Sequence, residues 1–494
     1  MDPRTPVIVG AGQLSYRHRP GGELLDPMAL AAEALRIAGH DSGTGDALLR
    51  RADSVRCVPS TSWQYRDQAA LTAAAVGAAP RETVQTTIFG GDGPQRLIGE
   101  TAAAIAAGEV EVALLSGAES VATLLSEQRE GRRPVWPEQP EGVSPTRVIG
   151  TDRQPVTDAE AAVGLLAPVN VYALIETALR ARDGHDPDSH LRKIAKLWSR
   201  FSAVAVDNPH AWLREPRSAD EIATASGGNR VVAEPYRKLM TANIQVDQAA
   251  ALILCSVEAA ERADVPSDRW VFPWAGGHAD EEWFVSERAD MAASPALGAA
   301  AGTALRHAGA EIDDVEYVDL YSCFPVAVEI AANELGIDLD ERTPTVTGGL
   351  TFAGGPGNDY ALHATATLVG MLREDPTAIG LSTALGWYLT KHAAGVFSAT
   401  PPSRPFALID AGATLQRPAP RPVTTGYSGP AALEAYTVPH GRDGAPEAAI
   451  ATALTPDGER VLLRSEDDTT VATMIAADPL GATIEIAGST VRGL

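Results

Sequence analysis

The sequence predicts an α/β protein of two related halves followed by a small β domain. Over residues 5–120, short apolar stretches alternate with Ala-rich helical stretches, the pattern of βαβ units around a buried, mostly parallel sheet. A Pro-initiated stretch that closes on AL-R-x-AG occurs at residues 26–39 and again at residues 294–309. Because these copies lie too far apart for a solenoid repeat, they indicate two duplicated halves. After residue 424, short alternating strands between turns predict a small antiparallel β-barrel.

Length and composition are those of a large, acidic globular protein. The chain has 494 residues, of which 45% are hydrophobic and 21% are charged, enough for two or three domains with substantial cores. A formal net charge of −24 argues against nucleic acid and anionic membranes as partners. The three cysteines, Cys57, Cys255 and Cys323, are too few and too scattered for a disulfide framework or a metal site. That usage is typical of a reducing compartment.

The N-terminal sequence favours a protein of the cytoplasm. The first residues lack the basic region and longer apolar core of a signal peptide. No apolar run in the chain is long and charge-free enough to span a bilayer. We therefore expect neither export nor membrane insertion.

The first elements of the chain follow the alternating pattern closely. Residues 7–9 predict a strand, residues 27–39 a helix with Gly39 as its C-cap, and residues 54–59 another strand. This succession of strand, helix and strand is one βαβ unit of the first half.

Three Gly-rich or short strand-to-helix junctions carry the candidate site. They read IFGGDG at residues 88–93, YSCF at residues 321–324 and GGLTFAGGPGND at residues 348–359. Glycine lets the backbone approach a ligand closely, and a helix that begins after such a turn directs free N–H groups toward it. Each turn alone could be an ordinary surface turn. Together they predict one pocket.

The order and spacing of these segments resemble the thiolase superfamily, most nearly its sterol-carrier-protein-type branch. The resemblance spans about residues 5–398 and includes PVIVGAGQ at residues 6–13 and NIQVDQAAALILCS at residues 243–256. It implies a duplicated thiolase fold, in which two βαβ halves form a layered αβαβα core. It also implies a place in the acetyl-CoA acetyltransferase family of lipid metabolism. Its ligand would be coenzyme A or an acyl-CoA, with no tightly bound cofactor.

The resemblance and the changes of pattern together give the expected domain organisation. The stretch after residue 121 is rich in Pro and Arg and then becomes helical at residues 169–182 and 191–204. In thiolases an excursion at this place covers the acyl-CoA pocket. The predicted domains are an N-terminal half (1–121 and 241–285), an inserted loop domain (122–240), a C-terminal half (286–399), a Pro-rich linker (400–423) and a β-barrel (424–494).

Basic residues in the inserted domain are candidate partners of the CoA phosphates, because Arg and Lys supply charge and donors to phosphate oxygens. For each of them, ordinary charge on a helix surface is the simpler interpretation. These candidates are Arg182, Arg192, Lys193, Arg237 and Lys238.

All four reactive positions of the family differ in this chain. Gly90 stands where a thiolase has its nucleophilic Cys, and Gly355 replaces the His of the Gly-His-Pro motif. The second catalytic Cys corresponds to Ala384, which is followed by Gly386, and the His of the His-Asp-Cys-Phe segment corresponds to Tyr321. Thiolysis and Claisen condensation need the Cys nucleophile and its partners, so we do not expect either reaction.

Polar groups nevertheless remain in the expected pocket. Tyr321 is the candidate proton-transfer residue and His392 the second choice, because both side chains can exchange protons in a suitable environment. Core packing, turns and helix caps are the structural alternatives for each candidate. Further polar candidates are Asp359, Tyr360 and His363. The predicted substrate-binding residues are Gly90, Gly91, Ser322, Cys323, Gly354, Gly355, Asn358, Ala384 and Gly386.

The C-terminal domain resembles the OB-fold modules that accompany thiolase-like proteins as fused or partner domains. Its strands are interrupted by one predicted helix at residues 469–477. We expect a lid or docking role, and a chain that is a monomer or a homodimer.

Two classes of function follow from the resemblance. The first is an acyl-CoA enzyme that has lost Claisen chemistry, with retro-aldol cleavage of a β-hydroxyacyl-CoA as the best candidate and acyl transfer as another. Such cleavage needs a base and an oxyanion site but no covalent acyl-enzyme. The second is a pseudoenzyme, that is, a non-catalytic acyl-CoA-binding or scaffold protein. The sequence leaves the two open.

Overall fold

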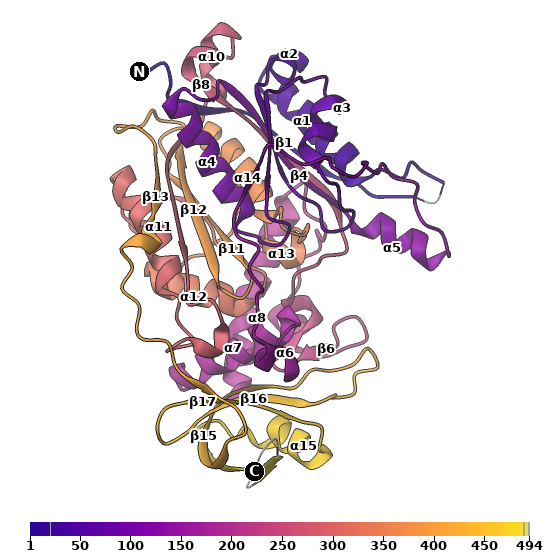
Figure 1. Cartoon of the computed structure of the whole chain (residues 1–494), viewed down its shortest axis with the longest axis vertical. Helices are drawn as coiled ribbons and strands as arrows, with labels where there is room; N and C mark the ends of the chain where they lie inside the picture. Colours follow the sequence, from indigo (N-terminus) through magenta and orange to yellow (C-terminus); the bar gives the residue numbers. More distant parts are fainter. Residues whose placement is uncertain (20, 488–489, 493–494) are drawn as a thin grey trace.

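Two sheets with two helices between them form the body of the protein (Figure 1). The computed structural model describes residues 1–19, 21–487 and 490–492. Helices α4 (Gly93–Ala107) and α14 (Tyr360–Glu374) contact both sheets. Both are buried on nearly all sides, as expected of helices sandwiched between two layers, and α4 is rich in Ala and Gly. The predicted layered α/β thiolase-like core is therefore confirmed.

The first sheet has six strands, five of which run in one direction. β2, β3, β4 and β5 pair in parallel, and β8 is antiparallel to both β4 and β1, so β1 has the same direction as β4. On its outer face lie α1 (Pro27–Asp41) and α3 (Gln68–Ala75). In spatial order the strands are β1 (Pro6–Ser15), β8 (Asp247–Ser256), β4 (Val112–Ser120), β2 (Ser54–Val58), β3 (Glu82–Thr86) and β5 (Arg147–Ile149).

The second sheet repeats the order and directions of the first. β10 and β11 are parallel, β11 and β12 antiparallel, and β12 and β9 antiparallel, as are β2, β4, β8 and β1. This repeat is the structural form of the duplication seen in the sequence. In spatial order the strands are β10 (Tyr317–Asp319), β11 (Gly380–Gly386), β12 (Lys391–Ser398), β9 (Phe272–Asp280) and β13 (Ala407–Asp410).

Two strands of this sheet come from outside the predicted C-terminal half of residues 286–399. β9 precedes residue 286, and β13 lies in the segment expected to be an extended linker. β13 pairs parallel with β9, so the linker contributes an edge strand to the core. The outer face is covered by α11 (Pro295–Ala308), beside which α12 (Pro325–Leu335) packs.

Gly39 is not the C-cap of α1. The helix continues to Asp41, where the backbone N–H of Ser42 donates to the Ala38 carbonyl. A Cβ at position 39 would lie 2.5 Å from the Gly45 carbonyl oxygen, so this glycine permits a close approach of two backbone segments. Its counterpart Gly309 does cap α11, with φ of 75°.

The inserted segment forms helices that pack on the second half. α7 (Pro168–Asp183) and α8 (Pro187–Asp207) confirm the two helices predicted there, and α7 contacts α12. No helix within the described residues has the length and apolar character needed to cross a bilayer. The remaining elements of the body are α2 (Asp46–Arg50), α5 (Val121–Arg129), α6 (Asp158–Ala162), α9 (Ala219–Ala223), β6 (Val231–Ala233), β7 (Tyr236–Arg237), α10 (Val257–Arg262) and α13 (Gly349–Phe352), with 3₁₀ turns at Lys238–Met240, Ser267–Arg269, Val285–Glu287, Ile312–Asp314 and Ala411–Ala413.

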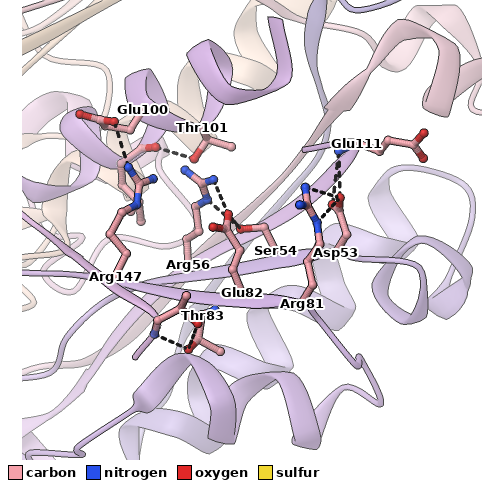
Figure 2. A network of polar contacts seen from close by, with 12 residues as sticks. Asp53, Ser54, Arg56, Arg81, Glu82, Thr83, Glu100, Thr101, Glu111 and Arg147 are labelled. Atoms are coloured by element: carbon pink, nitrogen blue, oxygen red, sulfur yellow. Dashed lines mark hydrogen bonds and ion pairs between the residues drawn. The ribbon is translucent and has the colours of Figure 1, made fainter. Parts of the chain in front are cut away.

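β5 covers the edge of the first sheet beside a polar network (Figure 2). In that network the buried Arg56 guanidinium donates to the Glu82 carboxylate at 2.7 Å and to the Ser54 hydroxyl at 2.9 Å. Arg147 of β5 lies 3.6 Å from Glu100 of α4. Because β5 occupies the ladder position next to β3, that side of β3 cannot pair with another chain.

The C-terminal residues form a curled, six-stranded half-barrel rather than the closed antiparallel barrel expected. β14 and β17 pair in parallel, and β17 approaches β19 without a ladder between them in the described residues. The predicted helix is confirmed as α15 (Asp468–Ala477). In spatial order the strands are β14 (Val423–Thr424), β17 (Arg460–Ser465), β16 (Ala449–Leu454), β15 (Ser428–Thr437), β18 (Thr483–Ala487) and β19 (Thr490–Arg492). Residues 488–489 and 493–494 of the predicted barrel lie outside the described part of the chain.

Arg460 joins this half-barrel to the body. Its fully buried guanidinium makes a bidentate pair with Glu434 and also donates to the carbonyls of Ser286 and Arg288 at 2.6 and 2.7 Å. Nearby, α7 packs against β15, at the lower end of the molecule in Figure 1. Two of these four charge-assisted hydrogen bonds, those to Ser286 and Arg288, thus cross the boundary between the domains, and the pair with Glu434 holds the guanidinium in place.

We predict that Arg460→Met lowers the free energy of unfolding by about 3 kcal/mol, because it leaves the Glu434 carboxylate without its partner. Urea unfolding of the full chain measures this loss. Arg464→Met on the same strand is the control, since Arg464 pairs with the exposed Glu466 and should change stability by less than about 1 kcal/mol. Equal effects of the two substitutions would contradict the role given to Arg460.

Candidate functional site

A pocket of about 410 Å³ opens where the N-terminal ends of α4 and α14 meet. The turns that precede both helices line it, together with β11, α7 and the YSCF segment. Its walls are mainly apolar and include six aromatic rings, for which we call it the aromatic pocket. These aromatic residues are Phe89, Tyr172, Tyr321, Phe324, Trp387 and Tyr388.

Asn358 ties the two Gly-rich turns together. Its side-chain oxygen accepts from the backbone N–H of Gly90 at 3.0 Å, and its side-chain nitrogen donates to the Ile88 carbonyl at 2.6 Å. Gly90 and Asn358 are far apart in the sequence, yet both line the pocket. The structure thus brings together three segments that the sequence analysis assigned to one site.

Tyr321 is one of the residues that line this pocket. Its backbone N–H donates to the Thr383 hydroxyl at 2.9 Å, and its ring meets that of Tyr360 edge-on at 5.6 Å. A Cβ on Gly91 would lie closer than 3.0 Å to the Tyr321 hydroxyl oxygen. Burial, and then the nearby Cys323 and Asp92, raise the pKa of this phenol. Tyr321 therefore presents a neutral hydroxyl, which suits a donor of hydrogen bonds.

Cys323 also lines the pocket but is not an activated thiol. Burial raises its pKa to about 12, so the nucleophilic thiolate is not populated at neutral pH. The other two cysteines, Cys57 and Cys255, are buried in β2 and β8, and burial raises the pKa of each to about 12.

A buried ion pair fills the space beside Gly90. The Lys391 ammonium lies 3.1 Å from Asp92 Oδ1 and donates to the Phe89 carbonyl at 3.0 Å. A Cβ on Gly90 would lie closer than 3.0 Å to both Lys391 Nζ and Asp92 Oδ1, and a Cβ on Gly386 would meet the same pair. The pair therefore occupies the space that a side chain would need at two positions where the family resemblance places catalytic groups or their neighbours.

The sequence analysis missed both members of this pair. Lys391 begins β12, and every residue of that strand is buried. A lysine at the start of such a strand needs a counter-ion, which was the available signal. Its partner Asp92 precedes α4 almost three hundred residues earlier, and nothing in the local sequence indicates that the two meet.

His392 does not reach the pocket. Its Nε2 lies 2.9 Å from the Ser294 hydroxyl and 3.1 Å from the Leu389 carbonyl oxygen, and burial lowers its pKa to about 3. Together with Lys391 it lines a second, polar cavity of about 520 Å³. The expectation that the chain leads His392 back to the pocket is therefore not met: its ring is neutral and points to α11.

The remaining predicted binding residues divide between the pocket and its surroundings. Gly355 lines the pocket, whereas Gly354 adjoins a separate small hollow against Gln248. The Ser322 hydroxyl accepts from the Leu350 N–H at 3.2 Å and so fixes α13. Ala384 is buried in β11, where it pairs with Ala393.

Asp359 and His363 form a neutral contact behind the pocket. His363 Nε2 lies 3.6 Å from Asp359 Oδ2, but burial raises the pKa of Asp359 and lowers that of His363 to about 3. Since both shifts favour uncharged forms, this is not an ion pair. Tyr360 donates to Asp319 at 3.0 Å, and none of Asp359, Tyr360 and His363 lines the pocket.

No Lys or Arg lines the pocket within the described residues. Arg182 donates to the Ala292 carbonyl at 2.9 Å, Lys193 lies 2.9 Å from Glu329, and Arg237 lies 3.0 Å from Glu234. Lys238 is exposed and lies one turn before Thr241, a pocket residue. Arg192 is also exposed, on α8.

Comparison with known proteins places this geometry in context. Residues 412–489 match the family described as the thiolase-like protein type 1 additional C-terminal domain. The crystal structure of a monomeric SCP2-thiolase like protein type 1 from Mycobacterium smegmatis is 33% identical, with a TM-score of 0.85 over 100% of this chain and 99% of that one. A search of curated proteins found no match.

More distant structures share the fold alone. The Ltp2-ChsH2(DUF35) aldolase is 19% identical, with a TM-score of 0.59 over 81% of this chain and 98% of that one. Human mitochondrial 3-ketoacyl-CoA thiolase in complex with CoA is 16% identical, with a TM-score of 0.53 over 81% of this chain and 98% of that one.

Substitution at Gly90 tests the crowding beside the ion pair. We predict that Gly90→Ala lowers the free energy of unfolding by roughly 1–3 kcal/mol, since the methyl group must displace Lys391 or Asp92. Gly370→Ala on α14 is the control, because nothing lies within 4 Å of a Cβ there, and it should raise stability slightly. Thermal and urea unfolding compare the two, and a neutral Gly90→Ala would show that the pair is not rigidly placed.

Proposed function

Since the chain belongs to the type 1 SCP2-thiolase-like proteins, we propose that it binds an acyl-CoA in the aromatic pocket and catalyses neither thiolysis nor Claisen condensation. The pocket volume of about 410 Å³ lies in the range of small-molecule sites. Its apolar walls suit an acyl chain, and the turns before α4 and α14 offer backbone N–H groups to a thioester oxygen.

The Asp92–Lys391 pair is the main observation against thiolysis and Claisen condensation. A covalent acyl-enzyme needs a nucleophile at the turn before α4. In this chain the space for its side chain is filled by the ammonium and carboxylate of that pair. The pocket's own thiol, Cys323, stays protonated because its pKa is about 12. Neither the turn before α4 nor Cys323 therefore supplies a nucleophile that could form an acyl-enzyme at neutral pH.

The pantetheine and phosphates would lie at and beyond the pocket mouth. Because no basic residue lines the walls in the described chain, the phosphates must be held outside. Lys238 is the best placed of the predicted basic residues, since it is exposed and adjoins the pocket residue Thr241 through the 3₁₀ turn.

Binding without thiolysis is the expected outcome with acetoacetyl-CoA and free CoA. Isothermal titration calorimetry should give a saturable acyl-CoA signal, and mass spectrometry should find no acylated residue. Ala242→Phe places a ring inside the pocket that Ala242 lines and should weaken binding roughly tenfold or more, whereas Gly370→Ala should leave it unchanged. Enzyme-dependent loss of acetoacetyl-CoA would refute the proposal.

Retro-aldol cleavage of a β-hydroxyacyl-CoA is the second candidate. One observation favours it: Tyr321 lines the pocket and presents a neutral hydroxyl next to Gly91. In this reaction the β-hydroxyl would pass its proton to water, a carbonyl would form as the Cα–Cβ bond breaks, and the electron pair of that bond would move to the thioester enolate, which would take a proton from water at Cα. The Tyr321 hydroxyl would donate to a developing oxyanion, because burial disfavours its use as a base.

Release of aldehyde or ketone from a panel of β-hydroxyacyl-CoA compounds tests this candidate. We expect Tyr321→Phe to lower the rate by roughly 10²-fold or more. The matched control is Tyr388→Phe, because the Tyr388 hydroxyl donates to the Leu166 carbonyl at 2.6 Å and its loss should have a small effect. If no compound is cleaved, the protein is a binding protein only; if Tyr321→Phe is fully active, the assignment is wrong.

We also infer a supporting role for the C-terminal domain, whose order of three strands, a helix and two strands (β15 to β19) is consistent with the predicted OB-fold-like module. The backbone of His440 donates to the Val232 carbonyl at 2.9 Å, and Val232 lines the pocket. The domain thus supports β6 at the pocket wall, in keeping with the docking role expected from the sequence.

A further inference from the structure

A buried cluster of three potential metal ligands lies between the inserted helices and the second half, apart from the aromatic pocket. Glu176 comes from α7, His190 from α8 and Glu329 from α12. One ligand atom from each lies within 4.8 Å of the others, and none of the three side chains is more than 2% exposed. We propose that this cluster binds one divalent metal ion of the zinc or manganese class.

The donor set suits such an ion. Imidazole nitrogen and carboxylate oxygen are both good ligands for Zn²⁺, and carboxylates also suit Mn²⁺. His190 Nε2 lies 2.6 Å from Glu176 Oε1, and the other Glu176 oxygen accepts from the Tyr236 hydroxyl at 2.6 Å. Tyr236 therefore orients the Glu176 carboxylate in the way that outer-shell partners orient metal ligands.

Unpaired polar atoms are the independent sign of an unfilled site. His190 Nδ1 is buried without a hydrogen-bond partner, and neither Glu329 oxygen accepts a hydrogen bond in the described residues, although the Lys193 ammonium lies beside one of them. A buried carboxyl group with a partly exposed ammonium as its counter-ion and a second carboxyl group beside it is an unfavourable arrangement. A divalent cation between Glu176 and Glu329 would satisfy both.

Lys193 is the group that a metal ion must displace. Its ammonium lies 2.9 Å from Glu329 Oε1, without hydrogen-bond geometry, and its side chain is 43% exposed. Glu329 and Lys193 also line a cavity of about 280 Å³, which gives an ion a route from the surface and gives Lys193 room to turn away. In the metal-free protein the ammonium is the counter-ion of Glu329; in the metal-bound protein it leaves that position.

The position of the cluster indicates a structural role for the ion. Tyr172 lies one turn before Glu176 on α7, and Phe324 directly precedes α12, which carries Glu329. The Tyr172 and Phe324 rings stack at 4.6 Å in the pocket wall. A metal ion at the cluster would therefore fix the two elements that hold this wall together.

Metal titration of the dialysed full-length protein tests the proposal. We expect calorimetry with Zn²⁺ and Mn²⁺, and elemental analysis after gel filtration, to give one ion per chain, and Co²⁺ to give ligand-field bands in the visible spectrum. Glu329→Gln should lower the affinity roughly 100-fold. Lys193→Met should raise the affinity, because the competing cation is gone, whereas Lys196→Met on the same helix should not change it.

The variants separate this proposal from a purely structural ion-pair network. Such a network predicts no ion in the wild-type protein and no gain in affinity for Lys193→Met. The proposal is overturned if the wild-type chain shows no saturable binding, if only Lys193→Met binds metal, or if Glu329→Gln binds as tightly as the wild type. The wild-type titration decides the matter even if a variant fails to fold.

Discussion

The packing of α4 and α14 between two sheets is the constraint on which the rest of the structure depends. A helix covered on both sides by strands must pack closely on two faces, so a change in side-chain volume on either face meets a neighbour. A Cβ on Gly99 of α4, for example, would lie closer than 3.0 Å to Leu408 of β13. Because both helices start at the same end of the layers, the turns before them are forced together. The pocket forms where these turns meet, and the Asn358 side chain holds them together through its hydrogen bonds to Gly90 and Ile88.

Much of this fold could be predicted from the sequence because its signals are local. Alternating strands and Ala-rich helices, the repeated AL-R-x-AG segment and the helices at α7 and α8 are each readable within a short window. Boundaries were harder, since they depend on contacts: Gly39 resembles a C-cap by pattern, but Ser42 extends the helix beyond it. Likewise, β13 lies in a Pro-rich stretch, and only its pairing with β9 makes it a strand.

The segments that line the pocket were predicted from the sequence, but the buried ion pair beside them was not. The Gly-rich turns and Tyr321 were found because each stands in a recognisable segment. Lys391 was missed because its partner Asp92 is remote in sequence. His392 was expected near the pocket because it follows the β11 turn, but the pairing of β12 directs its ring toward Ser294. Local pattern shows which segments gather, whereas the direction of a buried side chain depends on the tertiary neighbours that surround it.

The Asp92–Lys391 pair also bears on how such a chain could evolve. A cysteine at position 90 would collide with the pair while Lys391 and Asp92 remain. Loss of Lys391 first would leave Asp92 as a lone buried charge, and loss of Asp92 first would strand the ammonium. A nucleophile at this position would therefore need changes at Lys391 and Asp92 together with the change at Gly90, because most proteins have little stability to spare for either intermediate.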